Sequence, residues 1–569
     1  MLNVNSRFSQ APVNANIQRS KFDRDSVHIS TMSAGLLYPI FVDEVLPGDT
    51  FSMSTRVFAR MSTPIHPVMD NCYMDVYYFY VPYRLVWDHW KQFMGEPQDD
   101  PYASPTEYTI PALIRTEPVA GKMSSPSFKS VADYMGLPPL QNLPSKGVSA
   151  LPFRAYALIW NEWFRAQTIN KAIEFQKGDE DQYLVGNGGT GRFSAPATLV
   201  YYDPEDSSIA ERFLSTAAYG GYLAPVSKFH DYFTSALREP QRGDPVPIPL
   251  SGIAPVIPLA QTVELPEGLN TSFSGGYLSE YDGATEFNGS TEVAGQILNL
   301  TNSGADLGQL GKYSSIVANI SDLRYAFQMQ KFLEADNRYG TRYTETIRGH
   351  FGVTAPDASL QRPELLGGKR IRINMNQVLQ TSSTDSTSPQ GNTAAYSATL
   401  DVSESFIKSF TEHGCVIGLA CIRADHTYQQ GIERFWGRKD KFDFYFPEFS
   451  RISNQPIFNY EVYSDGTDSD YEVFGFQEAW SEYRYKPNRI SAECRSSYPQ
   501  SLDVWHYGDD YSSRPTLSSD WLAEPRRFID RTLAVDSTVS DQFIVDMYFD
   551  LDCVRPMPVN SVPGLSDHF

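Results

Sequence analysis

The stretch "CYMDVYYFYVPYRLVWDHW", residues 72–90, is apolar or aromatic at almost every position. Successive side chains of a strand point to opposite faces, so a strand with one solvated face alternates apolar and polar residues. Here one face would carry Met74, Val76, Tyr78 and Tyr80, and the other Tyr77, Phe79 and Val81. Only Asp75 interrupts the pattern. The stretch therefore predicts a strand that is covered on both faces.

Composition favours short strands joined by long loops. The chain has 569 residues, with 34 Tyr, 34 Phe, 38 Gly and 38 Pro. Length alone suggests two or more domains. Strand patterns, however, cluster near the two ends, at 36–62 around the turn "LPGDT" and again at 415–424, 471–485 and 542–554. This distribution predicts one β-sandwich whose connections have become very long.

Two segments break the strand pattern and predict helices. In "LPFRAYALIWNEWFRAQTINKAIEFQK", 151–177, apolar residues recur at helical spacing and Pro152 stands in the first turn, where a missing N–H is tolerated. In "SDLRYAFQMQKFLEADNR", 321–338, Ser321 is the candidate N-cap.

Three further segments are distinguished by composition. Residues 1–30 predict a mildly basic arm, with Arg7, Arg19, Lys21 and Arg24 against two aspartates, although an ordinary frayed terminus gives the same pattern. Residues 243–311 contain no Lys or Arg and carry acids that include Glu280, Asp282 and Glu286. They predict either a surface insertion with a contact site or a variable loop. Residues 555–569 predict an extended, Pro-rich tail.

Charge and cysteine content limit the class of protein. The formal net charge of −21 aids solubility and repels nucleic acid and anionic membranes. Five scattered cysteines form no disulfide framework and suggest a reducing compartment. The sequence shows neither an apolar export signal nor an apolar run of membrane-spanning length, so we expect synthesis in a cytoplasm and no membrane insertion.

A search for catalytic and metal-binding motifs assigns no site. Gly186, Gly188 and Gly191 match G-x-G-x-x-G, but the following "RFSAPATLVYYD" predicts no helix, so a glycine-rich turn is expected. The group His413, Cys415, Cys421 and His426 would be too extended on a strand to hold zinc, which predicts buried structural cysteines. No nucleophile elbow, P-loop lysine or H-E-x-x-H occurs. A distant pair of glycosidase carboxylates stays open. We expect no enzyme, cofactor or metal.

Several long blocks together resemble a known family, the major capsid proteins of gokushoviruses, which are small single-stranded DNA phages of the Microviridae. These blocks are "FDRDSVHISTMSAGLLYPIFVDEVLPGDTF", "YYFYVPYRLVWDHWKQFMGE", "LPFRAYALIWNEWFRAQ", "RYGTRYTETIRGHFGVTAPDASLQRPELLGG" and "MYFDLDCVRPMPVNSVPGL". They occur in the family's order and span nearly the whole chain. The resemblance is weakest in 243–311, as expected for the family's variable insertion.

The resemblance implies a mainly β fold, an eight-stranded jelly roll with very long interstrand loops containing a few helices. It implies assembly through pentamers into a T=1 icosahedral shell of sixty copies, with 243–311 forming threefold protrusions that meet a host receptor. The implied partners are a small basic DNA-binding protein, a scaffolding protein and a pilot protein. The implied locations are the virion and, during assembly, the host cytoplasm.

A shell around single-stranded DNA must accommodate the negative charge of this chain. We therefore expect Arg7, Arg19, Lys21 and Arg24 to face inward and bind DNA non-specifically, more weakly as salt rises, and the acidic insertion to face outward. Tyr77, Phe79 and Val81 need cover that extended loops and neighbouring subunits can supply, and they are expected to pack between subunits. The rival is a β-sandwich that binds or hydrolyses glycans. The missing export signal, the basic arm and the doubly apolar strand argue against it.

Overall fold

The structure is a computed structural model. It describes residues 17–96, 107–114, 128–139, 147–170, 223–244, 277–281, 284–288, 320–340, 342–379, 393–535 and 539–560, with a few single positions between them. The predicted glycine-rich turn at Gly186–Gly191 and the residues after 560 lie outside this part of the chain.

Eight strands of seven or more residues form the framework of the described chain. They are β2 (Ser26–Met32), β3 (Leu36–Val45), β4 (Thr50–Met61), β5 (Cys72–Pro82), β12 (Glu364–Arg372), β15 (Thr399–Ser409), β16 (Gly414–Ala424) and β19 (Phe543–Arg555). The predicted strands at both ends of the chain are confirmed, although only Val473–Glu478 of the stretch 471–485 is a strand.

The eight strands pair in a nested order. The first of them pairs with the last, the second with the seventh, the third with the sixth and the fourth with the fifth, each time antiparallel. Two further pairings, β19 with β4 and β16 with β5, complete the sheets β2-β19-β4-β15 and β12-β5-β16-β3. Such a long hairpin wound on itself is a jelly roll, so the expected fold is observed. Two short strands extend it: β1 (Ser20–Asp23) pairs with β19, and β9 (Ala224–Pro225) with β3.

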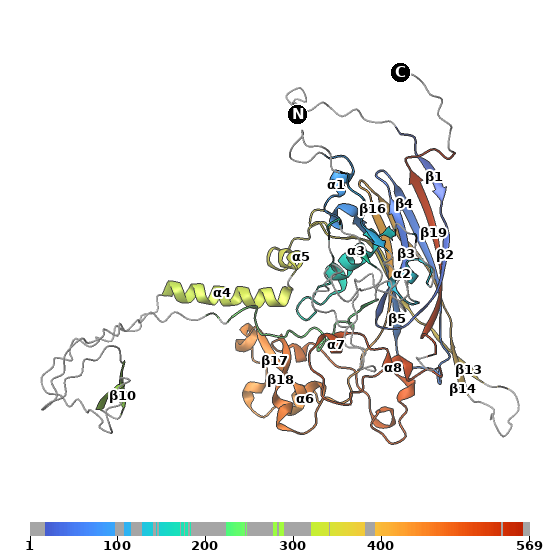
Figure 1. Ribbon diagram of the computed structural model, residues 1–569. Helices are drawn as coiled ribbons and strands as arrows, with labels where there is room; N and C mark the ends of the chain where they lie inside the picture. The colour runs from blue at the N-terminus through green and yellow to red at the C-terminus, as the bar shows by residue number, and fades with distance from the viewer. Residues whose placement is uncertain are drawn as a thin grey trace, which may run out of the picture. The chain divides into compact units, whose positions relative to one another are not determined.

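The two sheets pack face to face around one core (Figure 1). Residues of β4 and β19 alternate between buried and more exposed, which is the pattern of a sheet with one covered face. The rings of Phe41 and Phe549, from opposite sheets, lie 5.2 Å apart, and the Thr55 and Tyr78 hydroxyls are hydrogen-bonded across the core at 2.6 Å. Apolar packing therefore dominates this core, and the two hydroxyls of Thr55 and Tyr78 satisfy each other within it.

The sheet that contains β5 is covered on its outer face by a helix of the same chain. This helix, α3 (Leu151–Ile159), continues into a π-helical turn at Trp160–Phe164. Trp163 packs against Phe79 with ring centroids 5.4 Å apart, and Phe164 packs against Tyr77 with ring centroids 5.5 Å apart. The predicted helix is confirmed over 151–164, but the residues that follow are irregular.

Tyr77, Phe79 and Val81 are covered to different degrees within the single chain. Phe79 is 1% exposed and Val81 fully buried in the single chain, and Tyr77 is partly buried. Within the single chain, the helix therefore removes much of this aromatic face from water, so the prediction of two covered faces is confirmed. Packing of these three residues between subunits stays a prediction.

Two long connections carry the remaining elements. The connection from β5 to β12 contains α1 (Trp90–Phe93), β6 (Ala112–Ile114), α2 (Val131–Tyr134), β7 (Val148–Ser149), α3, β8 (Gln182–Tyr183), β9, β10 (Tyr277–Tyr281), β11 (Ala284–Asn288), α4 (Ile320–Tyr339) and α5 (Tyr343–Thr346). The connection from β16 to β19 contains β17 (Asn454–Phe458), α6 (Asn459–Val462), β18 (Val473–Glu478), α7 (Ser519–Leu522) and α8 (Arg527–Asp530). A hairpin of β13 (Met375–Leu379) and β14 (Thr393–Ser397) leads into β15.

Residues Gln241–Ala335 form a compact unit of their own, separate from the unit that contains the sandwich. In this unit β10 and β11 pair as an antiparallel hairpin. Helix α4 confirms the second predicted helix, but it begins at Ile320, so Ser321 lies inside the helix and is not its N-cap. No helix in the described ranges is long and apolar enough to cross a membrane.

Candidate functional site

Two cations of the predicted basic arm form ion pairs with carboxylates of the sheet strands. The first strand begins at Ser20, within the segment expected to be an arm. Lys21 lies 2.7 Å from a carboxylate oxygen of Asp552, and Arg24 forms an ion pair with Asp43. Arg19 is exposed. Arg7 lies outside the described residues.

The acidic residues of the insertion are described only by their register. Glu280 is opposite Thr285, and Glu286 is opposite Ser279, in the β10–β11 hairpin. Asp282 falls outside the described residues.

The histidines and cysteines tested for a metal site have separate structural roles. Cys415 and Cys421 are buried in β16, as expected of structural cysteines, and both thiols are free. Burial raises the pKa of Cys421 to about 12, so this thiol stays protonated. His413 packs against Trp90, with ring centroids 5.7 Å apart. His426 belongs to a different cluster.

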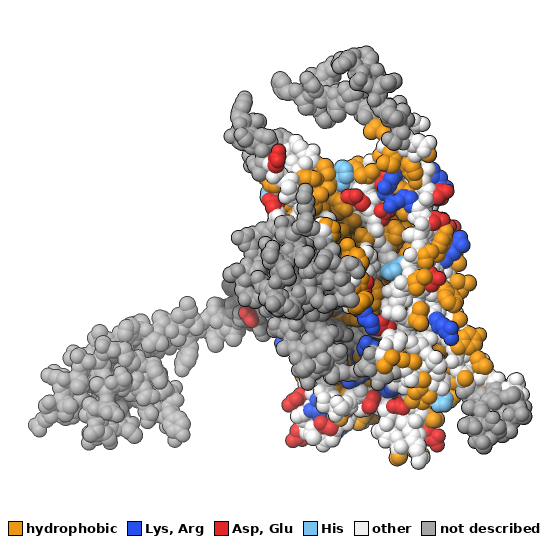
Figure 2. Space-filling model, turned by 45° about the vertical axis from the view of Figure 1, so that its right-hand side comes forward, with side chains coloured by type: hydrophobic (Ala, Val, Ile, Leu, Met, Phe, Trp, Pro, Cys, Tyr) orange, Lys and Arg blue, Asp and Glu red, His pale blue; other side chains and the backbone are white. Residues whose placement is uncertain are grey.

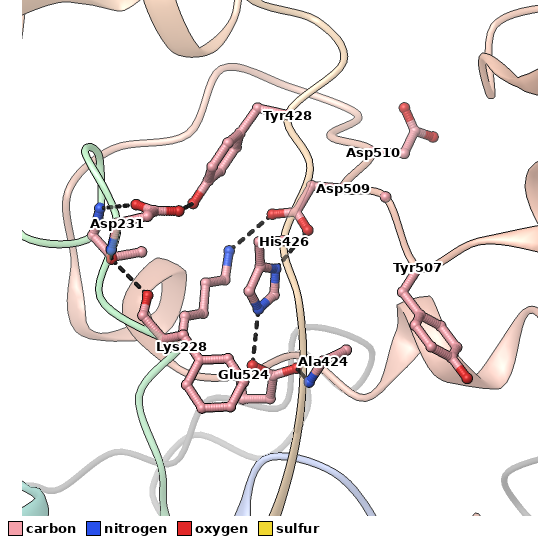
Figure 3. A network of polar contacts seen from close by, with 12 residues as sticks. Lys228, Asp231, Ala424, His426, Tyr428, Tyr507, Asp509, Asp510 and Glu524 are labelled. Carbon is pink, nitrogen blue, oxygen red and sulfur yellow. Dashed lines mark hydrogen bonds and ion pairs between the residues drawn. The ribbon is translucent and has the colours of Figure 1, made fainter. Parts of the chain in front are cut away.

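His426 is the centre of a buried network of charges (Figure 3). Its Nδ1 lies 2.7 Å from Asp509 and its Nε2 lies 2.8 Å from Glu524. Lys228 donates to the other Asp509 oxygen at 3.0 Å, and its ammonium lies 4.7 Å from the centre of the Trp521 ring. None of the four charged side chains is more than 3% exposed.

The network holds two cations and two carboxylates. Burial, the largest influence, lowers the pKa of His426, but Asp509 and Glu524 together outweigh it and raise that pKa to about 10. Burial likewise raises the pKa of Asp509, and His426 and Lys228 outweigh this effect and hold it well below its usual range. Both imidazole nitrogens therefore donate to carboxylates. The four charges compensate one another. Because Lys228 belongs to the β5–β12 connection and the other three residues to the β16–β19 connection, the network links the two long connections.

A pocket of about 630 Å³ opens in the β16–β19 connection. Its lining contains six cations and three carboxylates, an excess of positive charge in a chain whose net charge is −21. These residues are Arg434, Arg438, Arg484, Lys486, Arg489 and Arg495, with Glu433, Glu461 and Glu482. The aromatic lining residues are Tyr232, Phe233, Tyr428, Phe435, Trp436, Tyr483 and Tyr485.

The aromatic side chains of this pocket differ in exposure. Tyr232 is buried and stacks on Tyr485, with ring centroids 5.2 Å apart. Phe435 and Trp436, by contrast, are 42% and 70% exposed, although their rings are in contact at 4.7 Å. Large exposed aromatic rings beside cations are a feature of binding surfaces.

The carboxylates of the pocket neutralise only part of its positive charge. A single carboxylate, Glu433, pairs with both Lys486 and Arg489. Glu461 lies 3.4 Å from Arg434, and burial raises the pKa of Glu461 to about 7 against the opposing effect of that arginine. At neutral pH the pocket is therefore suited to an anionic ligand.

A second surface feature is an exposed aromatic segment. In "KFDFYFPEF", 441–449, Phe442 is 62% exposed and Phe444, Tyr445 and Phe446 are each 43–50% exposed. We call these four residues the aromatic segment. The density of aromatic residues is visible in the sequence, but their exposure is not.

The outer face of the sheet β2-β19-β4-β15 also exposes apolar residues. Ile29 and Leu400 are 72% and 71% exposed, and Ile29, Asp546, Phe58 and Leu400 form one row across four strands. Figure 2 shows hydrophobic side chains among charged ones on the side of the molecule that carries this sheet. Nothing in the described chain covers these residues, in contrast to the other sheet.

The comparisons with known proteins agree with this architecture. The family model described as "Capsid protein (F protein)" matches residues 11–565. The chain is 37% identical to capsid protein VP1 of Bdellovibrio phage phiMH2K, over 99% of this chain and 98% of that protein. It is also 37% identical to capsid protein VP1 of Chlamydia phage 1, again over 99% and 98%, and 36% identical to that of Spiroplasma virus 4, over 96% of each chain.

These relatives are capsid proteins of gokushoviruses, so the resemblance seen in the sequence is confirmed. The structure adds a two-sheet jelly roll with long connections. The chain is therefore a structural protein of the virion and not an enzyme, and it belongs to the phage capsid protein (F protein) family.

Proposed function

We propose that this chain assembles through pentamers into a T=1 icosahedral shell of sixty copies that encloses a single-stranded DNA genome. Membership of the capsid family supports assembly into a multi-subunit shell. A scaffolding protein, a pilot protein and a small basic DNA-binding protein are the proposed partners. The acidic insertion, with Glu280, Asp282 and Glu286, is proposed to face outward and contribute to host attachment. The subunits assemble in the host cytoplasm.

The observation that carries the proposal is the aromatic segment. A soluble monomer rarely leaves a contiguous group of large aromatic side chains in water. Aromatic residues are enriched at the cores of subunit interfaces, where they contribute large areas with few torsions to immobilise. We therefore assign the aromatic segment to a contact between copies of this chain. The apolar row on the outer sheet face is a second surface available to a neighbouring subunit or partner.

We propose that fewer cations of the basic arm bind DNA than the sequence suggested. Because Lys21 and Arg24 are paired with carboxylates of the sheet, they have less positive charge to offer DNA than the sequence suggested. Arg7 and Arg19 remain the arm residues proposed to face the genome.

The test replaces two residues of the aromatic segment with serine, as Phe444→Ser with Phe446→Ser. Both are well exposed, so the free energy of unfolding of the subunit should change by no more than about 1 kcal/mol. Closed particles, scored by negative-stain imaging with or without the scaffolding protein, should be lost. The control Phe351→Ser replaces a residue that is 77% exposed and lies outside the segment.

Particles of normal number and size from the double variant would show that the aromatic segment is not an assembly contact. A wild-type chain that never associates, even with the scaffolding protein, would overturn the proposed shell itself.

A further inference from the structure

The pocket of the β16–β19 connection is unusual for this chain because its charge is opposite to that of the whole. An acidic subunit must accommodate a polyanion if it encloses DNA, and two of the expected arm cations are already paired within the sheet. The pocket therefore combines a cavity with a local excess of cations in an otherwise acidic chain.

The arrangement of the pocket fits a nucleotide. A volume of about 630 Å³ falls within the range of small-ligand sites, about 300–1,000 Å³. The exposed ring of Trp436 offers a face on which a base can stack, and Lys486 and Arg489 share one carboxylate, so that together they carry an excess positive charge for a phosphate. Lys486 also lies 5.5 Å from the centre of the Phe435 ring, which places cation and aromatic face side by side.

This combination of stacking surfaces and cations characterises proteins that bind single-stranded nucleic acid without strong sequence preference. A duplex would keep its bases stacked on one another and away from Trp436. A neutral glycan could stack on the same ring but would not compensate the excess positive charge that Lys486 and Arg489 carry beside their shared carboxylate. The chemistry therefore favours an unpaired nucleotide with its backbone phosphate.

We infer that this pocket binds single-stranded DNA, with a base stacked on Trp436 and a phosphate held by Lys486 and Arg489. This inference rests on the proposed function, in which the shell encloses single-stranded DNA. It moves the main protein–genome contact from the predicted N-terminal arm to the connection between the last two strands of the jelly roll.

The probe is a fluorescein-labelled ten-residue oligothymidylate, and the readout is fluorescence anisotropy with the full-length, unassembled chain. Trp436→Ala should weaken binding by at least about fivefold, because a stacked base contributes about 1–3 kcal/mol. Trp436→Phe keeps an aromatic face and should stay within about threefold of wild type. An abasic oligonucleotide of equal length keeps the phosphates and should bind wild type about as weakly as the oligothymidylate binds Trp436→Ala.

Salt dependence tests the phosphate contact separately. Arg489→Gln should reduce the slope of log affinity against log salt by about 0.7, the value for one single-strand phosphate contact. Two matched controls lie outside the pocket: Arg60→Gln removes an exposed cation of β4, and Phe351→Ala removes an exposed ring. Both should leave affinity and slope unchanged.

Unchanged binding by Trp436→Ala, or equal affinity of wild type for the abasic probe, would overturn the inference. So would tighter binding of a heparin decasaccharide that also depends on Trp436, which would make the pocket a glycan site. Particle imaging distinguishes a failure of this inference from a failure of the proposed function. If wild type forms closed particles but the pocket variants bind DNA normally, only the inference fails, whereas the absence of any particles would overturn the proposed function.

Discussion

At the scale of single residues, His426 shows how much of a buried site is hidden from the sequence. The sequence marked His426 as a possible metal ligand because it follows His413, Cys415 and Cys421 closely. Its true partners, Asp509 and Glu524, are 83 and 98 positions away, and no local pattern connects them. A buried ion network is stable only while each charge keeps its partner, so its members act as one unit.

Replacement of His426 by glutamine should destabilise the subunit by about 3–5 kcal/mol, because it leaves Lys228 as the only cation of the network to balance the charges of Asp509 and Glu524. The exposed His230→Gln is the matched control and should change the free energy of unfolding by less than about 0.5 kcal/mol. Urea unfolding of the unassembled chain measures both.

The stability difference between wild type and His426→Gln should also depend on pH. The pKa of His426 is raised to about 10, above its ordinary value of 6.5. Its stabilising contribution is therefore fully present below pH 6.5 and is lost as pH rises from 6.5 through 10. The stability difference between wild type and His426→Gln should shrink over this interval. A difference that stays constant from pH 6.5 to 10 would show that His426 is not charged in the folded chain.

At the scale of elements, β5 and α3 show what periodicity predicts and what it leaves out. Periodicity predicted a strand that needs cover on both faces and a helix with an apolar side, and both are present. It did not show that these two elements cover each other, since the contact between Phe79 and Trp163 joins distant parts of the chain. From the sequence, loops of the same chain and neighbouring subunits were both possible sources of this cover. Element type is encoded locally, whereas pairing depends on the whole fold.

Because β5 is covered within the chain, removal of the Phe79 ring should destabilise the isolated subunit. Phe79→Ala should cost about 3–5 kcal/mol in the unfolding of unassembled chain, because a fully buried ring leaves a cavity. Phe58→Ala, in β4, is the matched control; its ring is 45% exposed on the outer sheet face, and its loss should cost far less. If Phe79→Ala impaired assembly but left the unassembled subunit as stable as wild type, Phe79 would belong to a subunit interface after all.

At the scale of the whole molecule, a single sandwich could be anticipated because strand patterns cluster at the two ends of the chain, and the jelly-roll topology was implied by the family resemblance. The first strand pairs with the last and the fourth with the fifth. One long excursion joins the paired strands β5 and β12, and the other joins β16 to β19, which lie in different sheets. The pocket and the aromatic segment could not be anticipated in the same way. Their residues lie in an irregular connection, where burial depends on tertiary contacts and not on periodicity.

The central claim is that this acidic chain closes into a shell of sixty copies, and particle mass tests it most directly. Sixty chains of 64.0 kDa weigh about 3.8 MDa, and a pentamer about 320 kDa. Mass photometry of genome-free particles, beside an icosahedral reconstruction, should show the first value, with pentamers as the assembling species. A stable 64.0 kDa monomer, or an open polymer without closed symmetry, would contradict the account.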